Sequence, residues 1–269
     1  NLDVAPGGVN DLLADALQLE ERRILEVSYE EKMMKLAVFV PVDDADALRE
    51  VLAKAGAGRL GNYEACSYTL AGKGRFRAVE GADPAVGEIG ELHIEQEEKV
   101  EVVFPQSMKN KILKAMLNSH PYEEPAYDLF TMDVATNEEG LGRIGKLKEP
   151  MTLREFAEFV KVQLDVPCLR AVGPLDQPVQ KVAIVGGDGN KYIRTAKFAG
   201  ADVFVTGDIG FHMAQSAELD GLSIIDPGHH VEKVMIKGVA EKMATLCTDK
   251  KLPVEFLQSK VHTEPFKFI

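Results

Sequence analysis

Short apolar runs alternate with segments of helical periodicity in the second half of the sequence. The apolar runs, which are typical of buried strands, are residues 179–185, 203–206 and 222–226, and we expect a last strand near residues 254–257. Segments with apolar residues at helical spacing lie at residues 192–199, 212–218 and 231–245. Strands that alternate with helices in this way predict an α/β fold, with a mostly parallel or mixed sheet covered on both faces.

A different pattern occupies the segment from residue 35 to about residue 131. Strands are predicted at residues 36–41, 63–70, 99–104 and 126–132, helices at 43–55 and 109–117, and an added ribbon at 75–79 and 92–95. Strand, helix, strand, strand, helix, strand is the ferredoxin-like order, here with an extra hairpin. We therefore interpret residues 31–136 as an inserted α+β domain, and residues 1–30 and 137–269 as the α/β core.

The two ends of the core carry local signals of their own. Residues 1–3 are interpreted as the end of a strand, the pair Gly7-Gly8 as a turn, and residues 9–17 as an amphipathic helix. The acidic, glycine-rich stretch 137–142 is expected to lead back from the insertion, and Thr152 with Glu155 predicts a helix N-terminus with a capping box. Because the sequence opens without Met, we expect it to be processed or to be part of a longer protein, with the core incomplete at its N-terminus.

The composition of the chain limits its possible binding partners and its cellular location. With 31 Lys and Arg against 43 Asp and Glu, the formal net charge is −12, which argues against nucleic acid as a partner. No apolar run approaches the roughly 20 residues of a membrane helix, so we expect no membrane association. The cysteines Cys66, Cys168 and Cys247 form no CxxC pair and are interpreted as buried thiols, which favours a cytoplasmic location.

Three polar loops follow predicted strands, where ligands of parallel α/β sheets gather. The glycine-rich stretch 186–190 allows close approach to a ligand, or is simply a tight turn, and it lacks a nucleotide-binding fingerprint. Asp208 ends another strand, and His212 lies one helical turn further on, so the two can face one cleft. Taken alone, however, that second pattern is better explained by an N-capping Asp with a surface His.

The third loop gives the sharpest local pattern of the sequence. His229 and Glu232 follow a Pro-Gly turn and lie three residues apart, so both can project from the first turn of a helix. Imidazole nitrogen with carboxylate oxygen is a common half-site for zinc, manganese or iron. Two exposed His residues beside a Glu that favours a helix N-terminus remain the alternative on this pattern alone. Residues 120–124, a His-Pro-Tyr-Glu-Glu stretch in the insertion, are interpreted as a rigid turn.

Several of these motifs together resemble a known family. Asn-Leu-Asp at residues 1–3, Gly-Gly-Val-Asn-Asp at 7–11, Gly-Gly at 186–187, Thr-Gly-Asp at 206–208 and Gly-His-His-Val-Glu-Lys at 228–233 resemble the Nif-three-like family. Its members are often labelled GTP cyclohydrolase I type 2 homologues. The insertion, with Gly-Asn-Tyr at 61–63 and the stretch 120–124, is similar to the PII-like or CutA-like domain of the long bacterial members.

The resemblance implies a dinuclear site for divalent metal ions, with zinc as the first candidate and two ions per chain in a complete site. By position, Asp3, His229 and Glu232 match metal ligands, while Thr206, Asp208 and His212 match a segment beside the site. Asp208 and His212 are therefore the candidate catalytic residues. The resemblance places the remaining ligands, including a His-His-Pro segment, in an N-terminal part that precedes the position matched by Asn1. It also implies a homohexamer in which the inserted domains associate as trimers.

Two functions follow as hypotheses. The first is a metal-dependent hydrolase of the GTP cyclohydrolase type, in which a metal-activated water attacks a small molecule or nucleotide. The second is a non-catalytic regulatory or scaffold protein, whose PII-like domain binds a small effector or a partner.

Overall fold

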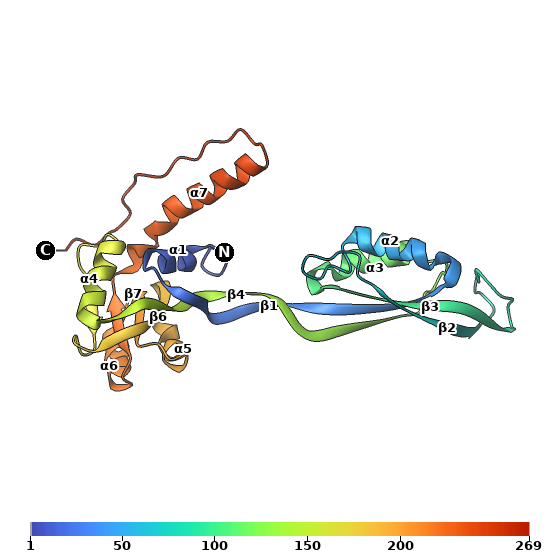
Figure 1. Ribbon diagram of the computed structural model, residues 1–269, viewed down its shortest axis with the longest axis horizontal. Coiled ribbons are helices and arrows are strands. Elements are labelled where there is room, and N and C mark those ends of the chain that lie inside the picture. The colour runs from blue at the N-terminus through green and yellow to red at the C-terminus, as the bar shows by residue number, and fades with distance from the viewer. Residues whose placement is uncertain (1, 269) are drawn as a thin grey trace. The chain divides into compact units, whose positions relative to one another are not determined.

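The chain divides into two compact units in a computed structural model that describes residues 2–268. One unit, here the core unit, comprises Asn1–Tyr29 and Glu139–Ile269, and the other, the inserted unit, comprises Glu30–Glu138. The chain leaves the core unit within strand β1 (Glu20–Pro41) and returns within strand β4 (Tyr127–Thr152). Each unit is described separately below (Figure 1).

The core unit is built on a mixed sheet. Its strands follow the order β4, β6 (Pro178–Asp188), β7 (Val203–Gly207), β8 (Ser223–Asp226) and β5 (Arg170–Val172). β6, β7 and β8 pair in parallel, as the alternation of apolar runs and helices predicts, while β4 and β5 add antiparallel edges. The expected strand at residues 254–257 is absent, because residues 252–268 form neither helix nor strand.

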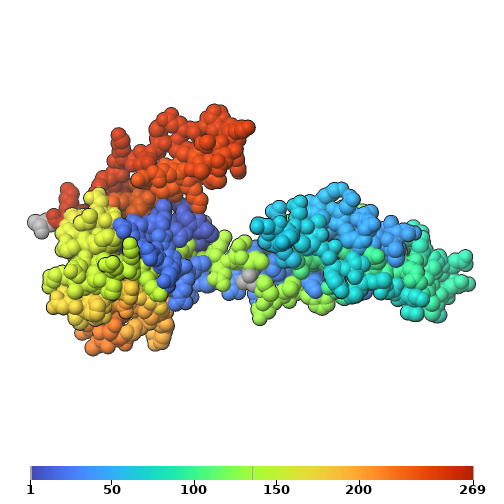
Figure 2. Space-filling model, in the orientation of Figure 1, coloured from blue at the N-terminus to red at the C-terminus, as the bar shows by residue number. Residues whose placement is uncertain are grey.

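Helices cover both faces of this sheet. Side chains of a strand alternate between faces, so Val182 and Ile184 of β6 pack with α1 (Val9–Ala16) and α4 (Leu153–Gln163). Ala183 and Val185 pack on the other face with α5 (Ile193–Phe198) and α6 (Phe211–Leu219), below the strands in Figure 1. The end of α7 (Val234–Asp249) and the segment after it, red in Figure 2, project from the rest of this unit.

Two local predictions for the core unit have different outcomes: the capping box of α4 is confirmed, and the strand end at the N-terminus is not. The capping box of α4 forms, because Thr152 Oγ1 accepts the Glu155 N–H while the Glu155 carboxylate accepts the Thr152 N–H. Asn1 lies outside the described residues, and residues 2–4 form a turn rather than a strand end. The turn is held from within, since the Val9 N–H donates to Leu2 O at 3.0 Å.

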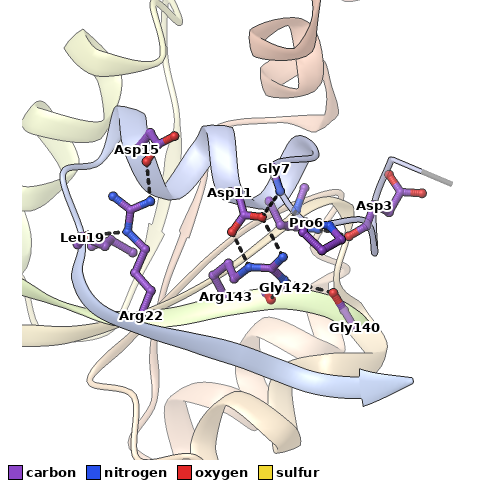
Figure 3. A network of polar contacts seen from close by, with 12 residues as sticks. Asp3, Pro6, Gly7, Asp11, Asp15, Leu19, Arg22, Gly140, Gly142 and Arg143 are labelled. Carbon is purple, nitrogen blue, oxygen red and sulfur yellow. Dashed lines mark hydrogen bonds and ion pairs between the residues drawn. The ribbon is translucent and has the colours of Figure 1, made fainter. Parts of the chain in front are cut away.

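A buried ion pair ties this N-terminal segment to β4 (Figure 3). The Arg143 guanidinium, only 7% exposed, binds both oxygens of Asp11, with an Nη2–Oδ2 distance of 2.8 Å. Arg143 Nη1 also donates to the carbonyls of Gly140 and Gly142, and Asp11 accepts the Gly7 N–H at 2.6 Å. The hydrogen bonds and the ion pair together hold the pKa of Asp11 below its usual value, against the effect of burial. This pair fixes α1 and the turn before it on the sheet.

The inserted unit follows the predicted strand and helix order. Its elements are β1, α2 (Ala45–Ala55), β2 (Tyr68–Arg77), β3 (Leu92–Pro105), α3 (Lys109–Ser119) and the first part of β4. β3 pairs antiparallel with β1 and with β2. Val38, Val100 and Phe104 form its core with the inward side chains of the two helices, which lie on one face of the sheet in Figure 1.

Two segments of the insertion and its exit belong to longer strands than expected. The predicted ribbon forms, because residues 75–77 pair with residues 92–94, but it continues the pairing of β2 with β3 that begins at Tyr68 instead of forming a separate hairpin. The glycines within β2 interrupt its hydrophobic pattern, so the sequence does not show that β2 is one continuous strand. A Cβ on Gly74 would lie 2.2 Å from Glu97 Oε2. Residues 137–142 lead back to the core unit as expected, but they do so as part of β4, where a Cβ on Gly140 would lie 2.1 Å from Glu26 O.

Among residues 2–268, no helix is both long and apolar enough to cross a bilayer. The three cysteines are free, but only Cys247 is buried, whereas Cys66 and Cys168 are partly exposed, contrary to the expectation of three buried thiols.

Candidate metal centre

The carboxyl ends of β6, β7 and β8 meet at one edge of the core sheet because these strands are parallel. The polar loops after them are therefore brought together, as expected for ligand sites of α/β sheets. His229 and Glu232 lie in a short 3-10 helix, His229–Lys233, that follows β8. With three residues per turn, side chains three apart lie above one another. His229 Nε2 accordingly lies 3.6 Å from Glu232 Oε2.

Asp208 fixes the imidazole of His229. His229 Nδ1 lies 2.7 Å from Asp208 Oδ2 and, since a carboxylate only accepts, Nδ1 carries the shared proton. Asp208 has a positive φ of 57°, and its carbonyl accepts a hydrogen bond from Asn190 Nδ2 at 2.9 Å. The bond to Asp208, followed by the nearby charge of Glu232, raises the pKa of His229 against the effect of partial burial. Nδ1 is thus occupied, and Nε2 is the nitrogen directed at Glu232.

The carboxylate of Glu232 is half-buried among other acids. Burial raises its pKa first, the carboxylates of Asp3 and Asp208 raise it further, and His229 opposes them. The sequence pattern alone could not show that Asp3, from the opposite end of the chain, approaches Glu232 closely enough to affect it. The site therefore combines one imidazole with the carboxylates of Asp208 and Glu232, and the charge of Asp3 acts on Glu232.

Two glycines of the 186–190 loop leave room for these side chains. Gly187 has a φ of +64°, and a Cβ there would lie 2.8 Å from Glu232 Oε1 and 3.1 Å from His229 Nε2. A Cβ on Gly186 would lie 3.4 Å from the same Oε1, which is an ordinary contact distance. The loop thus adjoins the same two side chains, and Gly187 is required there by a close approach as well as by its positive φ.

Asn10 connects the Asp3 turn to this loop, and the sequence analysis did not single it out. Its side chain is only 2% exposed. Asn10 Nδ2 donates to Asp3 O at 2.8 Å, and Asn10 Oδ1 accepts the Gly186 N–H at 2.9 Å. The available signal was an amide among apolar residues on the inner side of a short amphipathic helix, because buried amides are retained where they bond on both sides.

The other candidate residues lie in different surroundings. Thr206 is buried, and its hydroxyl donates to Gly187 O at 3.1 Å, so it supports the glycine loop. His212 is exposed on α6, where its ring contacts that of Phe211 with centroids 5.5 Å apart. The ring of His230 lies beside the ring of His262, with centroids 5.2 Å apart.

A cavity of about 770 Å³ opens beside the pair His229 and Glu232. Arg170, His230 and Lys233 also line it, but His212 does not. Its volume falls within the range of about 300–1,000 Å³ that is typical of small-molecule sites. A ligand of this size could therefore reach the Nε2 atom of His229.

The donor set has the chemistry of a divalent-metal site, although no group of three or more His, Cys, Asp or Glu within residues 2–268 has the arrangement to hold a metal ion. A histidine that binds metal through one nitrogen characteristically donates the other N–H to a carboxylate. His229 and Asp208 have this arrangement, and Glu232 lies beside the open nitrogen. The pair therefore fits part of a metal coordination shell.

The fold and the side chains at the carboxyl edge of the core sheet define the class of protein. It has an α/β core with a mixed sheet, carboxylates and an imidazole in contact at that edge, and an inserted α+β unit. Residues 1–265 match the Duf34/NIF3 (NGG1p interacting factor 3) family. The chain belongs to this family, as its motifs suggested.

Individual relatives agree with that assignment. A Bacillus subtilis protein called GTP cyclohydrolase 1 type 2 homolog is 50% identical over 269 residues, which are all of this chain and 72% of the relative. A Listeria innocua protein of the same name is 43% identical with the same coverage of both chains. Among solved structures, a Bacillus cereus protein related to NIF3 superposes with a TM-score of 0.87 at 48% identity, covering all of this chain and 71% of that one.

Proposed function

We propose that the core unit is a divalent-metal-dependent hydrolase in which Asp3, His229 and Glu232 bind metal. The observation that carries this proposal is the contact of His229 Nδ1 with Asp208, which leaves Nε2 directed at Glu232 beside a cavity. The name shared by the relatives, GTP cyclohydrolase 1 type 2 homolog, supports a purine nucleotide as the substrate to test first.

A divalent ion at this edge would supply a water of lowered pKa and polarise the group under attack. The chain's own residues prepare that chemistry. Asp208 keeps the His229 proton on Nδ1, so the lone pair on Nε2 faces the site. Glu232 and Asp3 supply negative charge, which offsets the charge of a cation more effectively in a half-buried setting than in water.

Asp208 is here assigned to orienting His229 rather than to moving a proton of the substrate, because its Oδ2 is already engaged with Nδ1. His212 has no part in this proposal, because it does not line the cavity. Arg170 and Lys233 line the cavity, so their positive charges lie where an anionic group of a nucleotide could enter. Arg170 is held by Asp226, whereas Lys233 donates to Asp165 O at 2.6 Å.

The assembly belongs to the proposal as well. The expected state is a homohexamer, with the inserted units associating as trimers and two metal ions per chain, zinc being the first candidate. Sedimentation equilibrium of the chain gives its mass directly, and a monomer at micromolar concentration would contradict the hexamer.

Metal content and nucleotide loss test the function. The purified chain is equilibrated with zinc, freed of excess metal and analysed by elemental analysis, and GTP is followed by chromatography. Metal bound at stoichiometric amounts, together with GTP loss that stops on chelation, supports a hydrolase. Asp3→Ala and Glu232→Ala should each abolish metal binding, whereas His212→Ala serves as the matched control and should keep it. Full occupancy in the Asp3 and Glu232 variants would refute the ligand assignment.

The alternative is a regulatory or scaffold protein whose inserted unit binds an effector. The observation that favours it is the lack of a complete three-ligand cluster within residues 2–268. Metal at background level and stable GTP would support this alternative over the hydrolase.

A further inference from the structure

The inserted unit contains a cavity of about 660 Å³ on the sheet face that α2 and α3 leave open. Leu70, Lys99 and Phe39 lie side by side across β2, β3 and β1, and all three line the cavity. Their strand neighbours Val38 and Val100 point to the opposite face and are buried under the helices. The segment 82–85 and the turn 122–126 complete the lining. The volume suits a small molecule.

A buried carboxylate lies in this cavity. Glu97 is only 9% exposed, and its Oε1 accepts a hydrogen bond from the Tyr122 hydroxyl at 3.2 Å. Among residues 2–268 no lysine, arginine or histidine forms an ion pair with it. Gly74 leaves the space that Oε2 occupies, since a Cβ there would lie 2.2 Å away. A carboxylate has about four acceptor positions, so most of its capacity remains for a ligand that presents N–H groups.

Aromatic rings stand next to the carboxylate. The rings of Phe76 and Tyr122 have centroids 6.0 Å apart, and both residues line the cavity with Phe39. Burial and the charge of Glu97 raise the pKa of Tyr122, so its hydroxyl stays protonated and keeps donating to Glu97. His120 fixes the turn beneath, because its Nδ1 accepts the Tyr122 N–H at 3.1 Å while Nε2 donates to Phe39 O at 2.9 Å. The predicted rigid turn at residues 120–124 is therefore also one wall of the cavity.

The charges around the cavity argue against a strongly anionic ligand. Lys73, Arg75 and Lys99 line it, and Lys99 is already paired with Glu101 at 2.9 Å. Against them stand four acidic side chains: Asp83, Glu97, Glu123 and Glu124. A polyphosphate would meet more acids than free cations, whereas an uncharged or weakly basic ring system would not be repelled.

We propose that this cavity binds a flat, uncharged N-heterocycle with two adjacent in-plane N–H donors, the chemistry of the guanine ring in guanosine. The two donors bond to the Glu97 carboxylate, and the ring packs against Phe76 and Tyr122. Burying the carboxylate is then offset by charge-assisted hydrogen bonds, and the rings provide apolar contact. The site shares no residue with the proposed metal centre, so it does not depend on the proposed hydrolase function.

Calorimetric titration of the whole chain with guanosine tests the proposal. Inosine is the matched ligand, because it lacks the 2-amino group and offers one N–H where guanosine offers two adjacent donors. Guanosine is expected to bind at least tenfold more tightly than inosine, as the loss of a hydrogen bond to a charged group predicts. Because GTP is also the first substrate to test at the metal centre, the comparison uses the part of binding that Glu97→Gln removes. That part should be no stronger for GTP than for guanosine, and a tenfold preference for GTP in it would overturn the assignment of an uncharged ligand.

Variants locate the site. Glu97→Gln should weaken guanosine binding at least tenfold, and Tyr122→Phe, which keeps the ring and removes one hydroxyl, should weaken it less. Glu95→Gln is the matched control, because Glu95 lies two residues away on β3, pairs with His93 and does not line the cavity. His229→Ala should bind guanosine like the unaltered chain; loss there would place the ligand at the metal centre. The proposal is overturned by unchanged binding in Glu97→Gln, or by no guanosine binding up to about 1 mM, the weak limit of specific recognition.

Discussion

Replacing Gly187 by alanine tests the geometry of the candidate metal centre with one methyl group. The backbone φ of +64° is in the left-handed region, and the added Cβ would lie 2.8 Å from Glu232 Oε1 and 3.1 Å from His229 Nε2. Both side chains would have to move. Gly210, by contrast, has a φ of −73° and nothing within 4 Å of its Cβ position, so Gly210→Ala is the matched control.

The magnitude has two parts. The left-handed conformation costs an alanine about 1–2 kcal/mol, and a less flexible unfolded chain returns about 0.4–1 kcal/mol of that. Displacement of Glu232 adds to the cost, so we expect a net loss of about 1–2 kcal/mol for Gly187→Ala. Gly210→Ala should stay within about 0.5 kcal/mol of the unaltered chain.

Metal affinity should respond more strongly than stability. Disturbing the groups that orient metal ligands typically lowers affinity about 10–100-fold, and Gly187→Ala shifts two proposed ligands together. Urea unfolding without metal measures the stability, and zinc titration with a competing chelator measures the affinity. If Gly187→Ala folds and binds zinc as tightly as Gly210→Ala, His229 and Glu232 are not metal ligands and the argument fails.

Three further changes test other features. Asp11→Asn leaves the buried Arg143 guanidinium with the carbonyls of Gly140 and Gly142 but without a negative charge beside it, and should cost about 3 kcal/mol in urea unfolding at pH 7. A loss below about 1 kcal/mol would contradict this assignment. Burial lowers the pKa of His120 below its usual 6.5, so the unfolded chain binds the proton more readily. The urea midpoint of unfolding should therefore be highest above pH 6.5 and fall as the pH drops below 6.5. His120→Gln should make this fall less steep, and an equally steep fall in the variant would refute the role of His120. Thr152→Ala removes the capping hydroxyl that Glu155 N–H uses and should cost about 1 kcal/mol by thermal unfolding, whereas Thr152→Ser should not.

Elements with a buried face could be predicted from the sequence, and elements without one could not. β6, β7 and β8 read as apolar runs because both of their faces are covered by helices. Residues 26–32 of β1 are mostly exposed, and although Val27 and Tyr29 alternate with polar residues, both side chains lie at the surface, so no strand was predicted there. β4 was underestimated for the same reason, because its acidic and glycine-rich stretch looks like a linker.

Only those contacts of the candidate site that lie within one short segment of the sequence could be predicted. The pair His229 and Glu232 follows from a separation of three residues, which places both on one side of a turn. The contact of His229 with Asp208 joins two loops, and local sequence fixes no such distance. His212 fits the spacing from Asp208, yet α6 carries its ring toward Phe211 instead. Spacing along a chain predicts a shared face within one element and does not predict which face of a second element points inward.

Asn10 explains how the two ends of the chain reach one site. A buried amide is costly unless both its donor and its acceptor are satisfied. Here the donor side is satisfied by the Asp3 carbonyl and the acceptor side by the Gly186 N–H. One side chain therefore fixes the Asp3 turn against the loop that adjoins Glu232, and the Asp11–Arg143 pair holds the same helix on the sheet (Figure 3). Folding therefore holds the backbone of Asp3 beside the loop that adjoins Glu232, and it brings a turn at one end of the chain and the pair His229 and Glu232 at the other to one edge of the core sheet.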